Sequence, residues 1–76
     1  MEIDSVVLDA TPHTLEEIDN GGLVALKTKA PFGQNNIFVV SGAIDDRVAL
    51  ISLDASRKRY LNEDATVYRV NKIVVK

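Results

Sequence analysis

The chain has 76 residues, a formal net charge of −2 and no cysteine. This length allows one domain over residues 1–76 and no second hydrophobic core. The lack of thiols excludes disulfide bridges, thiolate metal sites and cysteine nucleophiles. Hydrophobic residues make up 46% of the chain and charged residues 26%, proportions typical of a globular protein and not of a disordered one.

The sequence predicts a cytoplasmic protein. No apolar stretch approaches the roughly 20 residues that span a bilayer, so no membrane partner is expected. Residues 1–4 are acidic and lack the basic start and apolar stretch of a signal peptide. Small secreted domains usually need disulfides, which this chain cannot form.

The charges are unevenly distributed along the chain. Residues 1–20 hold six acidic residues and no lysine or arginine, whereas residues 21–76 hold nine basic and five acidic residues. The two parts therefore carry −6 and +4. Folding either produces a surface with two differently charged sides or neutralises the charges across strand pairs.

The first predicted elements are a strand at residues 3–8 and a short helical segment after it. Thr14 followed by Glu17 fits a capping box, and Leu15 with Ile18 forms an apolar pair at helical spacing. One or two helical turns are predicted there. Residues 19–22, Asp-Asn-Gly-Gly, are the strongest turn signal of the chain, because Asn and Gly tolerate positive φ.

Short apolar runs separated by turn residues continue to the C-terminus, as in a small all-β domain. The last strand changes its apolar phase, since Tyr68 shares a face with Val70 whereas Ile73 shares one with Val75. This slip predicts a bulge or bend near residues 71–72. The predicted segments are strands at 23–29, 37–41, 48–53, 57–61 and 67–75, with turns at 45–46 and 54–56 and a short turn or single 3₁₀ turn at 62–64.

Five or six short strands with one helical turn predict a small antiparallel barrel or a strongly bent sheet. The layout resembles the Src-homology-type small barrel. In that resemblance residues 8–22 are the long first loop, 54–56 the distal hairpin and 62–64 the turn before the closing strand. The first loop lacks the aromatic pair of the peptide-binding members and the chain has no tryptophan, so proline-rich ligands are not expected.

The sequence gives little support for catalysis or for metal binding. His13 is the only histidine, and Glu16 or Glu17 would have to orient it as a general base. No nucleophile motif accompanies it, so an exposed turn histidine is the preferred interpretation. Residues 45–46 and Asp54 do not match a calcium loop and are expected to be solvated turn formers. We expect a non-enzymatic protein with no cofactor and no metal.

Arg57, Lys58, Arg59 and Tyr60 form the best polar candidate. Three bases and an aromatic ring suit phosphate contacts and base stacking, which makes nucleic-acid binding the alternative function. Lys27, Lys29, Arg47 and Arg69 would extend such a patch. A pI of about 5.2 is unlike that of most nucleic-acid-binding domains. A charged edge strand that resists aggregation explains the same residues, and alternation places Lys58 on the opposite face from the two arginines.

Several strands are apolar on both faces, most clearly residues 48–53, 37–40 and 73–75. A monomeric barrel has one inside, so such strands need a second cover, from the helical turn, from self-association or from a partner. The sequence therefore predicts a protein-interaction module that binds a protein partner or itself, such as a small regulator or inhibitor of a larger protein machine, including phage-encoded factors. The residues predicted to bind the partner are Phe38, Ala49, Ile51, Leu53, Arg57, Arg59 and Tyr60.

Overall fold

A computed structural model describes residues 2–29 and 31–76 of the chain, which fold into short antiparallel strands and one 3₁₀ helix. The all-β prediction is confirmed, with a two-residue strand added to those predicted. The elements are β1 (Ile3–Leu8), β2 (His13–Thr14), η1 (Leu15–Glu17), β3 (Leu23–Ala25), β4 (Ile37–Ile44), β5 (Arg47–Ser52), β6 (Lys58–Asn62) and β7 (Thr66–Val75).

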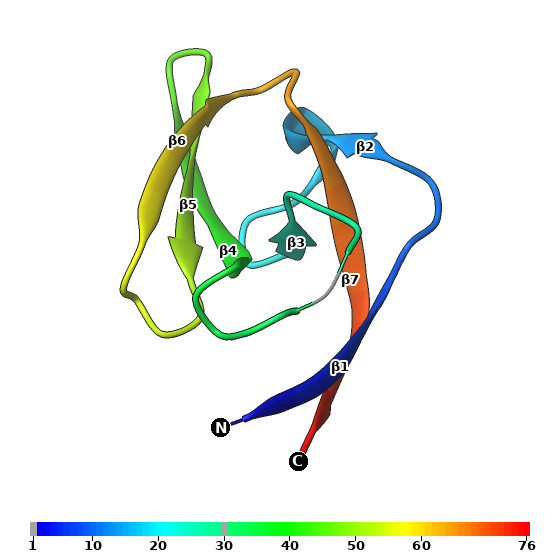
Figure 1. The fold of residues 1–76 in the computed structure, drawn as a ribbon. Coiled ribbons are helices and arrows are strands. Elements are labelled where there is room, and N and C mark those ends of the chain that lie inside the picture. The colour runs from blue at the N-terminus through cyan, green and yellow to red at the C-terminus, as the bar shows by residue number, and fades with distance from the viewer. Residues whose placement is uncertain (1, 30) are drawn as a thin grey trace.

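The strands form one strongly bent sheet in the order β1-β7-β3-β4-β5-β6, and β2 pairs with β7. Figure 1 shows the sheet curling around its own interior, with β1 and the end of β7 projecting as an arm that carries both termini. The sheet does not close into a barrel, so of the two predicted architectures the bent sheet is correct. Its edges are β1 at one end of the order and β6 at the other.

The predicted irregularity in the last strand is a β-bulge. Val7 lies opposite Lys72 and Leu8 lies opposite Val70, so Asn71 is the extra residue of β7. The inserted residue reverses the alternation that follows, which is why the apolar positions change phase at this point of the sequence. Another bulge, in β4, leaves Ser41 between two paired residues, and the strand continues to Ile44 instead of ending at residue 41.

The hydrophobic core lies on the concave side of the sheet. The predicted helical segment is the single turn η1, which places Leu15 against the core, and Ile18 follows it. The buried residues of the core cluster are Leu15, Ile18, Val24, Phe38, Val40, Val48, Leu50 and Val67.

β3, the beginning of β4 and the centre of β5 are buried on both faces. Val24 and Phe38 belong to the core cluster, whereas their neighbours Ala25 and Ile37 point to the opposite face and are also fully buried. Ala25 and Ile37 lie opposite each other in the β3–β4 ladder. Part of the cover that the sequence predicted for the second apolar face is therefore supplied within the chain.

β3 is shorter than predicted, since it ends at Ala25 instead of residue 29. Ala25 is paired with Ile37, the first residue of β4, so residues beyond Ala25 have no continuing partner in that strand. Before β4 the chain turns, because the Asn36 side chain accepts a hydrogen bond from the Gly33 N–H at 2.7 Å. A side-chain bond of this kind competes with strand formation.

Candidate interaction surface

The predicted partner-binding residues separate onto two faces of the β4–β5–β6 part of the sheet. In the ladder Arg59 lies opposite Leu50 on the inner face, and Tyr60 lies opposite Ala49 on the outer face. Leu53 follows β5, and its N–H donates to the Ile37 carbonyl at 3.0 Å. Inner positions are held by Phe38, Arg57 and Arg59, and outer positions by Ala49, Ile51 and Tyr60.

Two of these residues are interior. Phe38 is 2% exposed and Ala49 is 7% exposed, so their side chains support the fold and offer little area to a partner. Partner contact by Phe38 and Ala49 stays a prediction, which their burial does not favour. Arg57, Arg59 and Tyr60 are exposed, and Ile51 and Leu53 are half-buried.

A small hollow of about 190 Å³ opens on the inner face beside β6. Its charged lining is entirely basic, and Phe38 and Leu26 supply an apolar part. Within the described part of the chain, none of the three basic side chains makes a hydrogen bond or an ion pair. We call this site the basic hollow; it is lined by Leu26, Lys27, Asn36, Phe38, Arg57 and Arg59.

β6 exposes unpaired backbone groups along the edge that faces away from β5. The Ser52 N–H donates to the Arg57 carbonyl at 3.0 Å, and the Glu63 N–H donates to the Asp46 carbonyl at 2.9 Å. Because backbone groups alternate in direction along a strand, the odd-numbered residues from 57 to 63 face β5. Lys58 and Tyr60 therefore turn their N–H and C=O groups away from the sheet. Within residues 2–29 and 31–76, no strand pairs with this side of β6.

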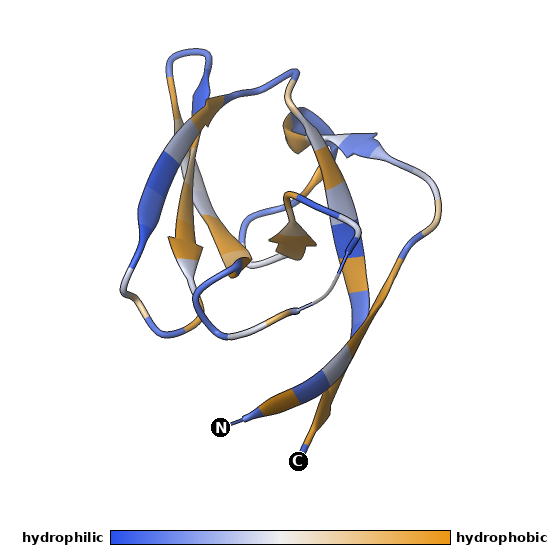
Figure 2. Ribbon diagram, in the orientation of Figure 1, coloured by the Kyte–Doolittle hydropathy of each residue, from blue (hydrophilic) through white to orange (hydrophobic). Residues whose placement is uncertain are grey.

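The outer face beside β6 carries exposed apolar side chains. Ile44 is 64% exposed and Tyr60 is 48% exposed, and Val39 and Ile51, which are level with Lys58 on the same face, are half-buried. The Lys58 ammonium lies 5.4 Å from the centre of the Tyr60 ring, within range of a cation–π interaction. Figure 2 shows the contrast between a hydrophobic β5 and a hydrophilic β6.

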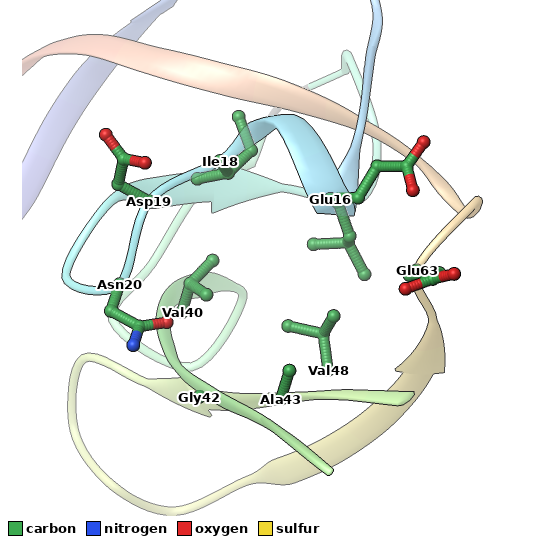
Figure 3. A pocket seen from close by; sticks show the side chains of 10 residues that line it. Glu16, Ile18, Asp19, Asn20, Val40, Gly42, Ala43, Val48 and Glu63 are labelled. Carbon is green, nitrogen blue, oxygen red and sulfur yellow. The ribbon is translucent and has the colours of Figure 1, made fainter. Parts of the chain in front are cut away.

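A larger open hollow of about 380 Å³ lies on another part of the sheet, between the η1 segment and the β4–β5 hairpin. Figure 3 shows Glu16 and Glu63 on one side of it and Asp19 on the other, with Ile18 and Val40 between them. All its charged lining residues are acidic. The two hollows thus carry opposite charges, whereas Glu2 and Lys76 form an ion pair across the β1–β7 arm, so both alternatives drawn from the charge distribution describe part of the surface.

The carboxylates of the acidic hollow lie on opposite sides of it. Among the residues that the structure describes, no group of three histidine, cysteine, aspartate or glutamate side chains is arranged to hold a metal ion. Asp54, the other acidic candidate, is engaged in its own turn. Hydrogen bonds from the Ser56 hydroxyl and N–H and from the Ser52 hydroxyl lower the pKa of Asp54 to about 2.

His13 belongs to a structural cluster and not to an exposed turn. Its Nδ1 lies 2.8 Å from the Glu17 carboxylate and its Nε2 lies 3.2 Å from the Asp9 carboxylate. The side chain is 20% exposed and lies in β2. The bonds to Glu17 and Asp9 raise the pKa of His13, and the same contacts help to lower the pKa of both carboxyls.

This cluster corrects two predictions. The histidine is neither exposed nor in a turn, and Glu17 alone of the two glutamates contacts it, since Glu16 lines the acidic hollow. Asp9 was missed in the sequence, although it precedes His13 by the same four residues that separate His13 from Glu17. With both ring nitrogens bonded to carboxylates, His13 joins three segments and leaves no free nitrogen for a substrate.

Comparisons with protein-family models, curated proteins and solved structures find no match to this chain. The resemblance in layout to a Src-homology-type barrel thus gains no support from a structural neighbour. No helix in the described residues is long and apolar enough to cross a membrane. The function has to be argued from the surface itself.

Proposed function

We propose that this protein is a non-enzymatic protein-interaction module. The observation that carries the proposal is the unpaired edge of β6, which presents free backbone groups at Lys58 and Tyr60. An open edge strand is a template for another chain, and many binding modules use it in this way. The exposed Tyr60 and Ile44 beside the edge add apolar area of the kind that protein partners cover.

Binding to nucleic acid is the competing function, and the unpaired cations of the basic hollow favour it. Two observations weigh against it. Tyr60 points to the opposite face from Arg57 and Arg59, so one strand of nucleic acid cannot easily use the ring and both arginines together. Its ring is also already in contact with Lys58. We therefore favour a protein partner.

The proposed context is that of a small cytoplasmic regulator or inhibitor that docks on a larger protein machine. A chain without cysteines suits a reducing compartment. Self-association through the same edge is the second way in which the module could cover its apolar side chains, and the experiment below separates the two. A phage-encoded factor is one source of such a regulator.

The test is affinity capture from native lysate with two matched variants. Tyr60→Ser removes an exposed side chain next to the β6 edge, and Val75→Ser removes one of similar exposure, 52%, from the β1–β7 arm. We expect the wild type and Val75→Ser to capture the same protein and Tyr60→Ser to capture at least about tenfold less, the loss expected for a central aromatic contact.

Light scattering coupled to size exclusion is run on the same samples. A dimer or larger species that is lost in Tyr60→Ser identifies a second copy as the partner. A strictly monomeric protein that captures nothing, or that captures equally in both variants, contradicts the proposal.

A further inference from the structure

We infer that the β6 edge and the basic hollow together form one site for an extended acidic segment of a partner protein. The segment would add to β6 as a further strand and place carboxylates in the basic hollow. This inference rests on the proposed function and adds the chemistry of the partner. Two independent features of the chain, unpaired backbone groups and unpaired cations, meet at the same strand.

The backbone of β6 defines where the segment lies. Lys58 and Tyr60 each turn an N–H and a C=O away from β5, so four backbone groups are available to an added strand. A strand supplies matching donors and acceptors at the same spacing, whereas a helix has used its own internally. The edge therefore selects an extended segment.

The inner face defines the charge of the segment. Arg57, which directly precedes β6, and Arg59 are two positions apart, about 7 Å along the chain, and both point to the face of the basic hollow. A residue of the added strand that lies opposite Arg59 points to that same face. Carboxylates at two alternate positions would thus meet the two guanidinium groups, which bind carboxylates in bidentate fashion. Lys27 lines the far wall of the hollow.

The outer face defines the residues that alternate with the carboxylates. On that face the residue between the two carboxylates would lie opposite Lys58, and the residue beyond the carboxylate at Arg59 would lie opposite Tyr60, whose ring is half exposed. An apolar or β-branched side chain packs well against an aromatic cross-strand neighbour. The structure therefore assigns an alternation of acidic and apolar residues to the bound segment, with acidic residues opposite Arg57 and Arg59 and an apolar residue opposite Tyr60.

A second copy of this chain is a less suitable occupant. Two β6 strands paired with each other would bring arginine and lysine side chains together, and like charges across a ladder are destabilising. The acidic edge β1 has the required pattern at residues 2–4, but Lys76 already lies 3.5 Å from Glu2, and Lys72 is paired with Val7 on the same arm. The arm is nearly neutral as a whole.

The experiment uses the full-length protein and a labelled acetylated peptide, Glu-Val-Glu-Thr-Glu-Val-Glu, followed by fluorescence anisotropy. One control peptide replaces each Glu by Gln, and another keeps the charges but carries Pro at the central Thr, which removes a backbone donor. A single-stranded oligothymidylate of the same charge is the third probe. Variant Arg59→Glu tests the hollow, and Arg47→Glu, an exposed arginine on β5, is the matched control.

We expect the acidic peptide to bind and both control peptides to bind at least about tenfold more weakly. Arg59→Glu should lower the affinity at least about tenfold and Arg47→Glu less than about twofold, since buried charge pairs dominate and rim charges contribute little. Hydrogen exchange gives a second readout. The amides of Lys58 and Tyr60 should become protected on binding, whereas that of Arg59, which already faces β5, should not change.

Four results would overturn the inference. Equal binding of the Gln peptide removes the role of charge, and equal binding of the Pro peptide removes strand addition. Binding of oligothymidylate without the acidic peptide assigns the site to nucleic acid. Self-association that is lost in both Arg59→Glu and Asp4→Lys assigns it to the β1 edge of a second copy. Failure of all the probes is a fifth result against this inference, but it leaves the capture experiment with Tyr60→Ser unaffected, so the two proposals fail separately.

Discussion

Arg59 lies directly opposite Leu50 in the β5–β6 ladder, so an exposed guanidinium and a fully buried leucine start from the same face of the sheet. The position next to the core would suit an apolar residue. A charged residue in such a place lowers stability unless its head group reaches water. If Arg59 serves binding, a substitution at this position should reduce binding without reducing the stability of the fold.

Arg59→Leu is expected to keep or raise the free energy of unfolding, by up to about 1 kcal/mol, because the new side chain extends the apolar inner face. The same variant should lose binding of the acidic peptide. Urea unfolding followed by circular dichroism measures the first effect, and anisotropy measures the second. A loss of stability above about 1 kcal/mol would show that Arg59 is a structural residue.

Leu50 itself tests the position of the core. Leu50→Ala removes a side chain that is fully buried in the centre of β5, and such substitutions cost about 2 to 5 kcal/mol. Ile44→Ala, at the exposed end of β4, should change the stability by less than about 0.5 kcal/mol. Thermal unfolding of both variants measures the difference. Similar melting temperatures would contradict the core as assigned.

The sequence was informative wherever alternation was the dominant signal. The phase change between Tyr68 and Ile73 predicted the bulge at Asn71, because a one-residue insertion is the simplest way to keep both apolar groups on the same face of the sheet. Lys58 was placed opposite in direction to Arg59 for the same reason. The alternation of residue types predicts the direction of side chains correctly when the two faces of a strand have different surroundings.

Features that depend on contacts between distant segments were not predicted. The burial of Ala25 and Ile37 depends on covering segments that local alternation does not specify. The burial of Phe38 and Ala49 likewise depends on how tightly the sheet bends. The basic hollow joins Lys27 to Arg57, thirty residues apart. Lys27 was one of four basic residues named as extensions of the Arg57 patch, but no spacing rule in the chain singles it out.

The turn before β3 depends on Gly22. A Cβ at this position would lie 2.7 Å from the Ile18 Cγ2 and 3.0 Å from the Asp19 carbonyl oxygen. The Gly22 carbonyl also accepts a hydrogen bond from the Val40 N–H at 3.0 Å, which holds the backbone in place. Gly22→Ala should therefore cost about 1 to 3 kcal/mol through overpacking. Denaturant unfolding measures the change.

Gly21 is the matched control because it has open space but a φ of +89°. Gly21→Ala should cost about 1 to 2 kcal/mol from the backbone alone, and Gly21→Asn less, since Asn tolerates this conformation. The comparison of Ala and Asn at the two positions distinguishes backbone strain from crowding, because Asn cannot relieve crowding at Gly22. Gly22→Asn should thus be at least as destabilising as Gly22→Ala, and recovery by Asn at Gly22 would contradict the steric explanation.

Acid should destabilise the turn after β5 at unusually low pH. The folded pKa of Asp54 is lowered to about 2, so its contribution is complete above the usual value of about 3.9 and is lost as the pH falls through 2. Asp54→Asn should be less stable than the wild type at pH 6, with the difference disappearing by pH 2. Carbon-detected NMR titration of the carboxyl checks the pKa, and an ordinary value would contradict the hydrogen bonds to Ser52 and Ser56.

The His13 cluster should give the stability a maximum in mildly acidic solution. The folded pKa of His13 is raised above the usual value of about 6.5, so its contribution is complete below that value and is lost as the pH rises through the folded pKa. Asp9 and Glu17 have lowered pKa values, so their contributions are lost only as the pH falls through those values. Arg69 opposes the effect on His13 by charge repulsion.

His13→Gln keeps a hydrogen-bonding side chain but cannot become charged. The wild type should exceed this variant in urea midpoint most clearly at about pH 5.5, a value between the two sets of titrations, and the difference should shrink by about pH 9. Glu17→Gln should reduce the same difference, because the Glu17 carboxylate makes the shortest contact with the ring, at 2.8 Å. An NMR titration that places the His13 pKa at or below about 6.5 would contradict the cluster.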